Sequence, residues 1–244
     1  MKIALASAPV KNLDVDFNLQ AIVDAMATCS GKADLILFGE SVLQGFDCLC
    51  WEYEKDRHTA LALTDDPIKR LCAAAKEYKI AVSFGFIEHG DNVLYSSQLF
   101  IGADGQIVDV FHRVSIGWKE PAADEHYIEG TQFNVFEYGG KKFATGLCGD
   151  LWTEGRPEEM KALNADVVLW PVWCDYSAEE WNTTTKYEYA EQAQLCGDHV
   201  LFVNPFCADE TEDDAAAGGV AYFNDGRIVE EAPCGKSGIL IVEL

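Results

Sequence analysis

Short apolar runs alternate with amphipathic segments along most of the chain. The runs have the length of buried strands, and the amphipathic segments repeat apolar residues every three or four positions, as helices do. Strands are predicted at 2–8, 34–38, 80–87, 93–101, 107–113, 133–138, 142–147, 166–170, 199–203, 219–223, 227–231 and 238–243. Helices are predicted at 14–29, from 66 onward, from 157 onward and at about 179–196. We therefore expect an α/β fold with mixed sheets covered by helices, as one compact domain over residues 1–244.

Polar and special residues mark several of the predicted boundaries. Either Asp14 or Asp16 can cap the first helix, and Pro67 opens the second. Pro157 is followed by two glutamates, which suit the positive end of a helix. Asn-Asp-Gly at 224–226 is typical of a hairpin turn between two late strands.

Composition and charge narrow the class of protein. The chain has 244 residues, a hydrophobic fraction of 49% and a net charge of -23, which would repel nucleic-acid phosphates. No stretch has the apolar length that crosses a bilayer, and residues 1–20 do not resemble a signal peptide. We expect a cytoplasmic protein that binds neither nucleic acid nor membrane. The acidic run at 209–214 is interpreted as a solvated loop, with no metal site assigned to it.

The chain contains nine cysteines, an odd number, without a CxxC pair or a histidine at zinc-finger spacing. Most lie in apolar segments, which favours reduced and buried thiols. Cys48 and Cys50 could form a redox pair, although this spacing is not specific.

Two reactive side chains follow buried strands. Glu40 ends the run Leu35-Ile36-Leu37-Phe38-Gly39-Glu40, and Cys148 ends Phe143-Ala144-Thr145-Gly146-Leu147-Cys148. The carboxyl edge of a sheet is where α/β proteins build their sites. A thiol needs a base or a stabilised thiolate to act as a nucleophile, and backbone N–H groups near Gly149 could also hold an oxyanion. The pair predicts covalent acyl-transfer chemistry, with a buried structural cysteine as the alternative.

These segments together resemble the nitrilase superfamily of carbon–nitrogen hydrolases. Phe38-Gly39-Glu40 is similar to the family's glutamate motif, and Gly146-Leu147-Cys148-Gly149-Asp150-Leu151 followed by Arg156-Pro157-Glu158 is similar to its nucleophile motif. Further similarity lies in 165–171 and 188–204, so that the resemblance covers residues 2–243 in the family's order.

The resemblance implies a four-layer αββα sandwich that commonly pairs through helices into a homodimer or higher homo-oligomer. It implies that Cys148 attacks a nitrile, amide or carbamoyl carbon and forms a thioester, which water activated by Glu40 hydrolyses. It implies no cofactor and no metal. The family's second carboxylate corresponds to Glu125, with Glu129 as the second choice; the alternative for Glu125 is a solvated loop acid.

The family's lysine position departs from the pattern, because it corresponds to Arg113. Arginine can stabilise an oxyanion and pair with Glu40, but it does not release a proton as an ammonium can. Lys119 is close enough in sequence to take this role instead. A third interpretation gives the role to neither and makes Arg113 a structural ion-pair partner.

Four aromatic residues would surround the site if the resemblance holds: Trp118, Trp152, Trp173 and Phe206. They favour a small substrate with apolar or planar parts, whereas the alternative is that each belongs to the core. Asp175 and Tyr176 could supply polar contacts. His112 and His126 are interpreted as ordinary loop histidines.

Three functional hypotheses follow from these observations. The first is hydrolysis of a non-peptide carbon–nitrogen bond, with an amide favoured over a nitrile or carbamoyl group. The second is a catalytically silent protein of this fold that binds a metabolite or a partner, suggested by Arg113. The third is a thiol redox sensor that uses Cys148 or the Cys48/Cys50 pair.

Overall fold

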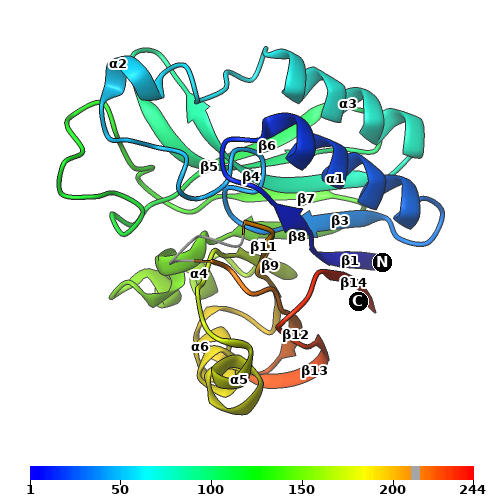
Figure 1. Cartoon of the computed structure of the whole chain (residues 1–244). Helices are drawn as coiled ribbons and strands as arrows, with labels where there is room; N and C mark the ends of the chain where they lie inside the picture. The colour runs from blue at the N-terminus through cyan, green and yellow to red at the C-terminus, as the bar shows by residue number, and fades with distance from the viewer. Residues whose placement is uncertain (210–214) are drawn as a thin grey trace.

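Two facing sheets form the centre of the computed structural model, which describes residues 1–209 and 215–244 (Figure 1). The first sheet has the order β14 (Gly238–Glu243), β1 (Lys2–Ser7), β3 (Leu35–Phe38), β4 (Ala81–His89), β5 (Leu94–Ile101), β6 (Ile107–His112). The second has the order β13 (Arg227–Ala232), β12 (Val220–Asn224), β10 (His199–Val203), β9 (Val167–Pro171), β8 (Lys141–Thr145), β7 (Val135–Tyr138). A small third sheet pairs β2 (Pro9–Val10) with β11 (Phe206–Cys207).

Both large sheets are mixed and have the same plan. Three parallel strands lie at the centre, β1, β3 and β4 in one sheet and β8, β9 and β10 in the other. The outer strands of each sheet run antiparallel to their neighbours. The carboxyl ends of the parallel strands therefore gather at one edge of each sheet, which is the usual position of sites in such folds.

Helices cover the two outer faces. Helices α1 (Val15–Cys29) and α3 (Asp66–Tyr78) lie on the first sheet, and α4 (Arg156–Ala162) and α6 (Lys186–Cys196) lie on the second (Figure 1). Asp14 caps α1 by accepting a hydrogen bond from the Phe17 backbone N–H at 3.0 Å, which decides between the two predicted caps. Two short helices, α2 (Tyr53–Asp56) and α5 (Ala178–Glu180), lie in the connections.

Alternate residues of each central strand enter different layers. In β3, Ile36 packs against the helices of the first sheet, whereas Leu35 and Leu37 enter the layer between the sheets. In β9, Val168 and Trp170 face the helices, while Val167 and Leu169 face inward. Both faces of these strands are buried, which explains their continuous apolar runs. The result is the predicted four-layer αββα sandwich.

The predicted helix at 179–196 is interrupted. Trp181–Thr185 forms a π-helical turn (η2) between α5 and α6. The hydroxyl groups of Thr183 and Thr184 donate to the carbonyls four residues earlier, at 2.6 and 3.0 Å. These hydrogen bonds and the buried Trp181 side chain accompany the wider turn. The hydrophobic periodicity of the sequence is the same with or without such a turn, so it could not predict it.

Other features fall outside the sequence prediction or outside the described residues. The short strands β2 and β11 and the helix α2 were not predicted, because two to four residues carry too little periodicity. Of the predicted acidic loop at 209–214, residues 210–214 lie outside the described residues. Within the described residues, no helix is long and apolar enough to cross a membrane.

Candidate active site

Glu40 lies just beyond the carboxyl end of β3 and is fully buried. Its backbone N–H donates to the Val172 carbonyl at 3.1 Å, which ties the first sheet to the loop after β9 in the second. A Cβ on Gly85 of β4 would come within 2.7 Å of the Glu40 Cα and 2.4 Å of the Ser41 nitrogen. Glycine at 85 therefore leaves the space in which Glu40 turns away from the sheet.

The Glu40 carboxylate has one bonded oxygen and one free oxygen. Oε1 accepts hydrogen bonds from Arg113 Nη1 at 2.9 Å and from Ser96 Oγ at 3.1 Å. Oε2 is buried and has no hydrogen-bond partner among the described residues. Burying an unpaired carboxylate oxygen costs free energy, and Oε2 remains able to accept a proton.

Arg113 follows β6 and is almost completely buried beside Glu40. Its Nε donates to Ser115 Oγ at 3.0 Å and lies 4.0 Å from Asp150 Oδ1. Burial alone would lower the pKa of Arg113, but the negative charges of Glu40, Cys148 and Asp150 outweigh burial and raise it. The guanidinium therefore stays charged.

Asp150 connects the loop that follows Arg113 to the loop that contains Cys148. Oδ1 accepts from the backbone N–H groups of Val114 and Ser115 at 3.1 and 2.8 Å, and Oδ2 accepts from that of Leu147 at 2.9 Å. Burial raises the pKa of Asp150 to about 6, although Arg113 and the hydrogen bonds oppose the rise. This single side chain holds residues 113–115 of one layer against residues 147–150 of another.

Cys148 opens a 3₁₀ helix, η1 (Cys148–Trp152), after β8. Its φ of 46° is a left-handed conformation that is uncommon for a residue with a side chain and costs on the order of 1–2 kcal/mol. The half-buried thiol lies 3.7 Å from the Trp173 carbonyl oxygen, and the Cys148 carbonyl accepts a hydrogen bond from Trp170 Nε1 at 3.0 Å. Strain of this kind is typical of side chains presented for chemistry.

Arg113 also approaches the loop that contains Cys148. A Cβ on Gly149 would lie 2.8 Å from Arg113 Nη2, so the absence of a side chain there allows the guanidinium to approach the backbone after Cys148. The guanidinium thus lies between Glu40 on one side and the turn at Cys148 and Gly149 on the other. The structure brings together Glu40, Arg113 and Cys148 of the predicted catalytic residues.

Glu40 lines a small cavity that has room for about one water molecule. Apolar side chains form most of its wall, together with Ser41 and Ser96: Phe46, Leu49, Trp51, Ile87 and Trp118. Trp51 has a φ of 63° and its ring centroid lies 6.1 Å from that of Trp118. Trp173 is buried and stacks on Phe46 with ring centroids 5.6 Å apart. Trp118 and Trp173 therefore lie in or beside the candidate site.

Trp152 and Phe206 have different surroundings. Trp152 is 44% exposed and packs edge-on against Tyr189. Phe206 lies on the short strand β11, paired with Pro9 of β2. Asp175 is exposed, and the Tyr176 hydroxyl contacts the Tyr189 hydroxyl at 3.2 Å. A role for any of these in substrate binding stays a prediction.

Lys119 and the two predicted second carboxylates lie on the loop after Arg113. Lys119 Nζ forms an ion pair with Glu129 Oε1 at 2.6 Å and donates to the Tyr127 carbonyl at 3.0 Å. Glu129 is half-buried, whereas Glu125 is exposed. Lys119 thus forms an ion pair with Glu129, whereas Arg113 forms one with Glu40.

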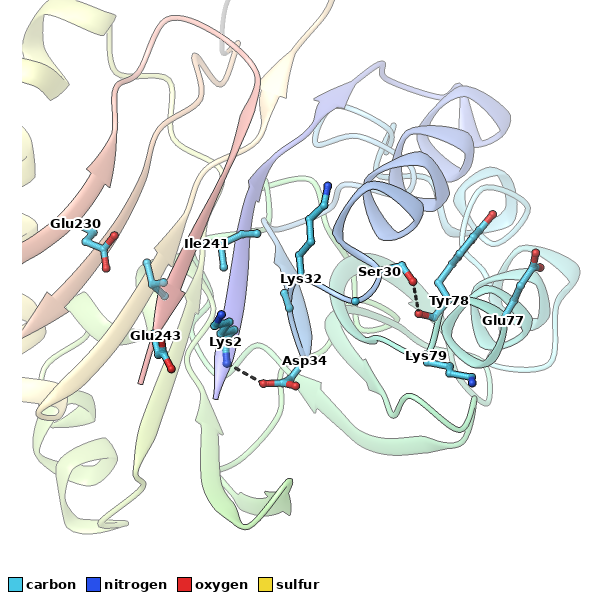
Figure 2. A pocket seen from close by; sticks show the side chains of 13 residues that line it. Lys2, Ser30, Lys32, Asp34, Glu77, Tyr78, Lys79, Glu230, Ile241 and Glu243 are labelled. Carbon is cyan, nitrogen blue, oxygen red and sulfur yellow. Dashed lines mark hydrogen bonds between the residues drawn. The ribbon is translucent and has the colours of Figure 1, made fainter.

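A broad hollow lies at the other end of the first sheet. Figure 2 shows Lys2, Asp34 and Glu243 at its wall, with the Lys2 backbone N–H donating to Asp34 Oδ2 at 2.8 Å. Its volume is about 1140 Å³. Lys2 and Asp34 precede the residues at which β1 and β3 pair, so the hollow lies at the amino ends of these strands, opposite Glu40. Its lining contains none of the predicted catalytic residues.

The sheet plan and the Glu40, Arg113 and Cys148 cluster can now be compared with known proteins. The carbon–nitrogen hydrolase family model matches residues 2–244. The chain belongs to this family. The match includes both sheets and every predicted catalytic residue, and no group of three or more His, Cys, Asp or Glu within residues 1–209 and 215–244 is arranged to hold a metal ion.

Several carbon–nitrogen hydrolase relatives are similar along the chain. A glutamine-dependent NAD(+) synthetase of Acinetobacter baylyi is 25% identical over 99% of the chain and 44% of its own length. An (R)-stereoselective amidase of Pseudomonas sp. is 25% identical over 69% of the chain and 59% of its own length. The chain therefore spans about half of the length of these relatives. An amidase from Nesterenkonia sp. shares the fold at a TM-score of 0.77 and 20% identity, covering 100% of this chain and 90% of that one.

Several residues of the site escaped sequence reasoning. Ser96 bonds Glu40 from β5, and the Trp173 carbonyl oxygen, on the loop after β9, lies 3.7 Å from the Cys148 sulfur. A lone serine and a backbone carbonyl carry no local signal in the sequence. Asp150 was noted only as part of the nucleophile motif, yet its three backbone hydrogen bonds shape the site. The only hint in the sequence was that Asp150 lies two residues after Cys148.

Proposed function

We propose that this chain hydrolyses a non-peptide carbon–nitrogen bond of a small molecule, with an amide as the favoured substrate and Cys148 as the nucleophile. The observation that supports it most is the meeting of a buried Glu40–Arg113 pair with a strained cysteine from the other sheet. Glu40 has one oxygen fixed by Arg113 and Ser96 and one oxygen left to accept a proton.

In the proposed reaction, Glu40 Oε2 takes the thiol proton of Cys148, and the sulfur attacks the amide carbon. The carbonyl electrons move onto oxygen, where the charge of Arg113 and the backbone N–H groups of η1 stabilise the oxyanion. When the carbon–nitrogen bond breaks, protonated Glu40 gives its proton to the leaving amine. Glu40 then takes a proton from water, which attacks the thioester and releases the acid and the Cys148 thiol.

The Arg113 guanidinium limits which residues can transfer protons in the proposed reaction. Arg113 is a permanent cation with two fixed hydrogen bonds, so it supplies charge and orientation but no proton. Glu40 must therefore carry every proton transfer in the cycle. The small apolar cavity above Glu40 supports a substrate whose group near the reacting carbon is compact and uncharged.

The test is ammonia release from a panel of short aliphatic and ω-amides. Cys148→Ala should abolish release while far-UV circular dichroism stays unchanged, because the nucleophile is lost and the fold is not. Lys119→Met is the matched control for the cation: it removes a neighbouring charge that is paired with Glu129 and should retain most of the activity. Turnover by Cys148→Ala, or its complete loss in Lys119→Met, would contradict the proposal.

Arg113 also supports a second candidate, a silent family member that binds a metabolite. It predicts thermal stabilisation by an amide without ammonia release, and the same stabilisation in Cys148→Ser. Repeated turnover on any amide would exclude this candidate.

A further inference from the structure

A buried carboxylate outside the catalytic group holds one wall of the small cavity in place. Asp56, the last residue of α2, accepts from the Cys50 backbone N–H at 2.9 Å through Oδ1 and from the Trp51 backbone N–H at 2.8 Å through Oδ2. Oδ1 also accepts from the Cys50 thiol at 3.1 Å, and Oδ2 accepts from the Tyr127 hydroxyl at 2.7 Å. Asp56 is 2% exposed, and it joins the loop before α2 to the loop that contains Tyr127.

Asp56 accepts all four of these hydrogen bonds because it is ionised. Burial alone would raise its pKa, but the hydrogen bonds from Tyr127, Cys50 and Trp51 outweigh burial and lower the pKa. Burial and the hydrogen bond to Asp56 raise the pKa of Tyr127, so its hydroxyl remains a donor. An ionised carboxylate offers acceptors only, which is what the four donors require.

The backbone of Trp51 depends on this support. Its φ of 63° lies in the left-handed region, which a bulky side chain rarely adopts. The Trp51 ring packs against the rings of Tyr127 and Trp118, with centroids 5.3 and 6.1 Å apart. The three rings belong to one apolar cluster, separate from the layers under the helices and from the layer between the sheets. Asp56 and this cluster therefore fix the position of the Trp51 ring.

The Trp51 ring and the catalytic carboxylate line the same cavity. Glu40 and Ser96 form part of its wall, together with Trp51 and Trp118. In the proposed reaction the carbon attacked by Cys148 must lie within reach of Glu40, so the group on that carbon lies next to this cavity. Trp118 is buried whereas Trp51 is half-buried, so removing the Trp51 ring would enlarge the cavity toward solvent.

We propose that Trp51 is a specificity-determining residue that limits the acyl group of the amide to a short aliphatic chain, and that Asp56 is a positioning residue that holds Trp51 there. The inference rests on the proposed function and narrows its substrate class. It favours short aliphatic amides over ω-amides, whose acyl chain ends in a second polar group that the apolar wall cannot bind.

The experiment measures kcat/KM for ammonia release from acetamide, propionamide, butyramide and valeramide by the full chain. Wild-type kcat/KM should fall by about tenfold or more for each methylene group that no longer fits, the lower end of what an apolar pocket achieves. Trp51→Ala should remove this fall and raise the valeramide-to-acetamide ratio of kcat/KM by about tenfold or more. Trp51→Phe keeps a smaller ring and should give an intermediate ratio.

Asp56→Asn tests the positioning role. Asparagine has nearly the same volume but one accepting oxygen in place of two, so either the Trp51 N–H and the Tyr127 hydroxyl or the two Cys50 donors lose their acceptor. The ratio should rise as in Trp51→Ala, by a smaller factor. Asp34→Asn is the matched control: that carboxylate also accepts a backbone N–H, from Lys2 at the opposite end of the first sheet, and should leave the ratio unchanged.

The outcomes distinguish this inference from the proposed function. Turnover of acetamide with an unchanged ratio in Trp51→Ala would overturn the inference and leave the proposed function intact. A loss of activity in Asp56→Asn that is equal for all four amides would show a merely structural role and overturn the positioning assignment. Absence of ammonia release from every amide by the wild-type protein would overturn both proposals. Should Trp51→Ala not fold, an unchanged ratio in Trp51→Phe overturns the inference in its place.

Discussion

The buried Glu40–Arg113 pair makes a quantitative prediction about stability. Arg113→Met keeps much of the side-chain volume but removes the cation that lies 2.9 Å from Glu40 and 4.0 Å from Asp150. Both partners are buried, so the variant leaves two carboxylates without a cation. Breaking a buried pair in this way costs about 3–5 kcal/mol, because the remaining charge stays desolvated.

In a chain of this size, each kcal/mol corresponds to about 2–4 °C in the melting temperature, so Arg113→Met should melt about 6–20 °C lower. Glu40→Gln should cost less, because Asp150 still faces the arginine. The double variant removes both charges, and its loss should be smaller than the sum of the single losses by about 2 kcal/mol or more.

The pH dependence of the free energy of unfolding of Arg113→Met gives an independent check, because its sign can be predicted. Burial raises the pKa of Asp150 to about 6, and removing the arginine takes away the nearby positive charge that opposes this rise. A raised folded pKa means that the folded state binds more protons, so stability is present at low pH and lost as pH rises. The free energy of unfolding of Arg113→Met, measured by urea titration, should therefore increase as pH falls from about 7.5 to about 5.5. Strictly additive single variants, or an Arg113→Met loss below about 1 kcal/mol, would refute the reasoning.

Two other predictions concern residues that hold the site in place. Gly85→Ala should destabilise the protein by about 3 kcal/mol, because the added methyl group would lie 2.4 Å from the Ser41 nitrogen. Gly238→Ala is the control: no atom lies within 4 Å of the added methyl group, so the melting temperature should hardly change. Equal melting temperatures for the two variants would contradict this. Burial raises the pKa of Asp150 to about 6, so its contribution to stability should be lost as pH rises from about 4 to about 6. The urea-derived stability of Asp150→Asn should lack that part of the pH dependence, and identical slopes in the two proteins would show that Asp150 does not titrate there.

The layers of the fold could be predicted because each apolar run forms a strand that is buried on both of its faces. Runs such as 34–38 and 166–170 have no polar face, and only a sheet covered on both sides accommodates that pattern. The π-helical turn at Trp181–Thr185 could not be predicted, since neither the turn nor the hydroxyl bonding that accompanies it changes the hydrophobic periodicity of the segment.

The site was predictable where motifs mark strand ends, and Glu40 and Cys148 are such residues. The choice between Arg113 and Lys119 could not be made from spacing, because it depends on which carboxylate each cation meets in space. The structure pairs Arg113 with Glu40 and Lys119 with Glu129.

The division of the site between the two sheets has a consequence for the maturation of the protein. Glu40 and Arg113 extend from the first sheet, whereas Cys148 extends from the second, and Asp150 and the Glu40–Val172 hydrogen bond join them. With Cys148 as the proposed nucleophile, a chain in which only one half has formed would carry an ordinary thiol, inert toward the amides that would acylate it in the assembled site. The Cys148 thiol therefore becomes reactive only at the end of folding. The onset of fast alkylation of Cys148 during refolding would report when the two halves of the sandwich dock.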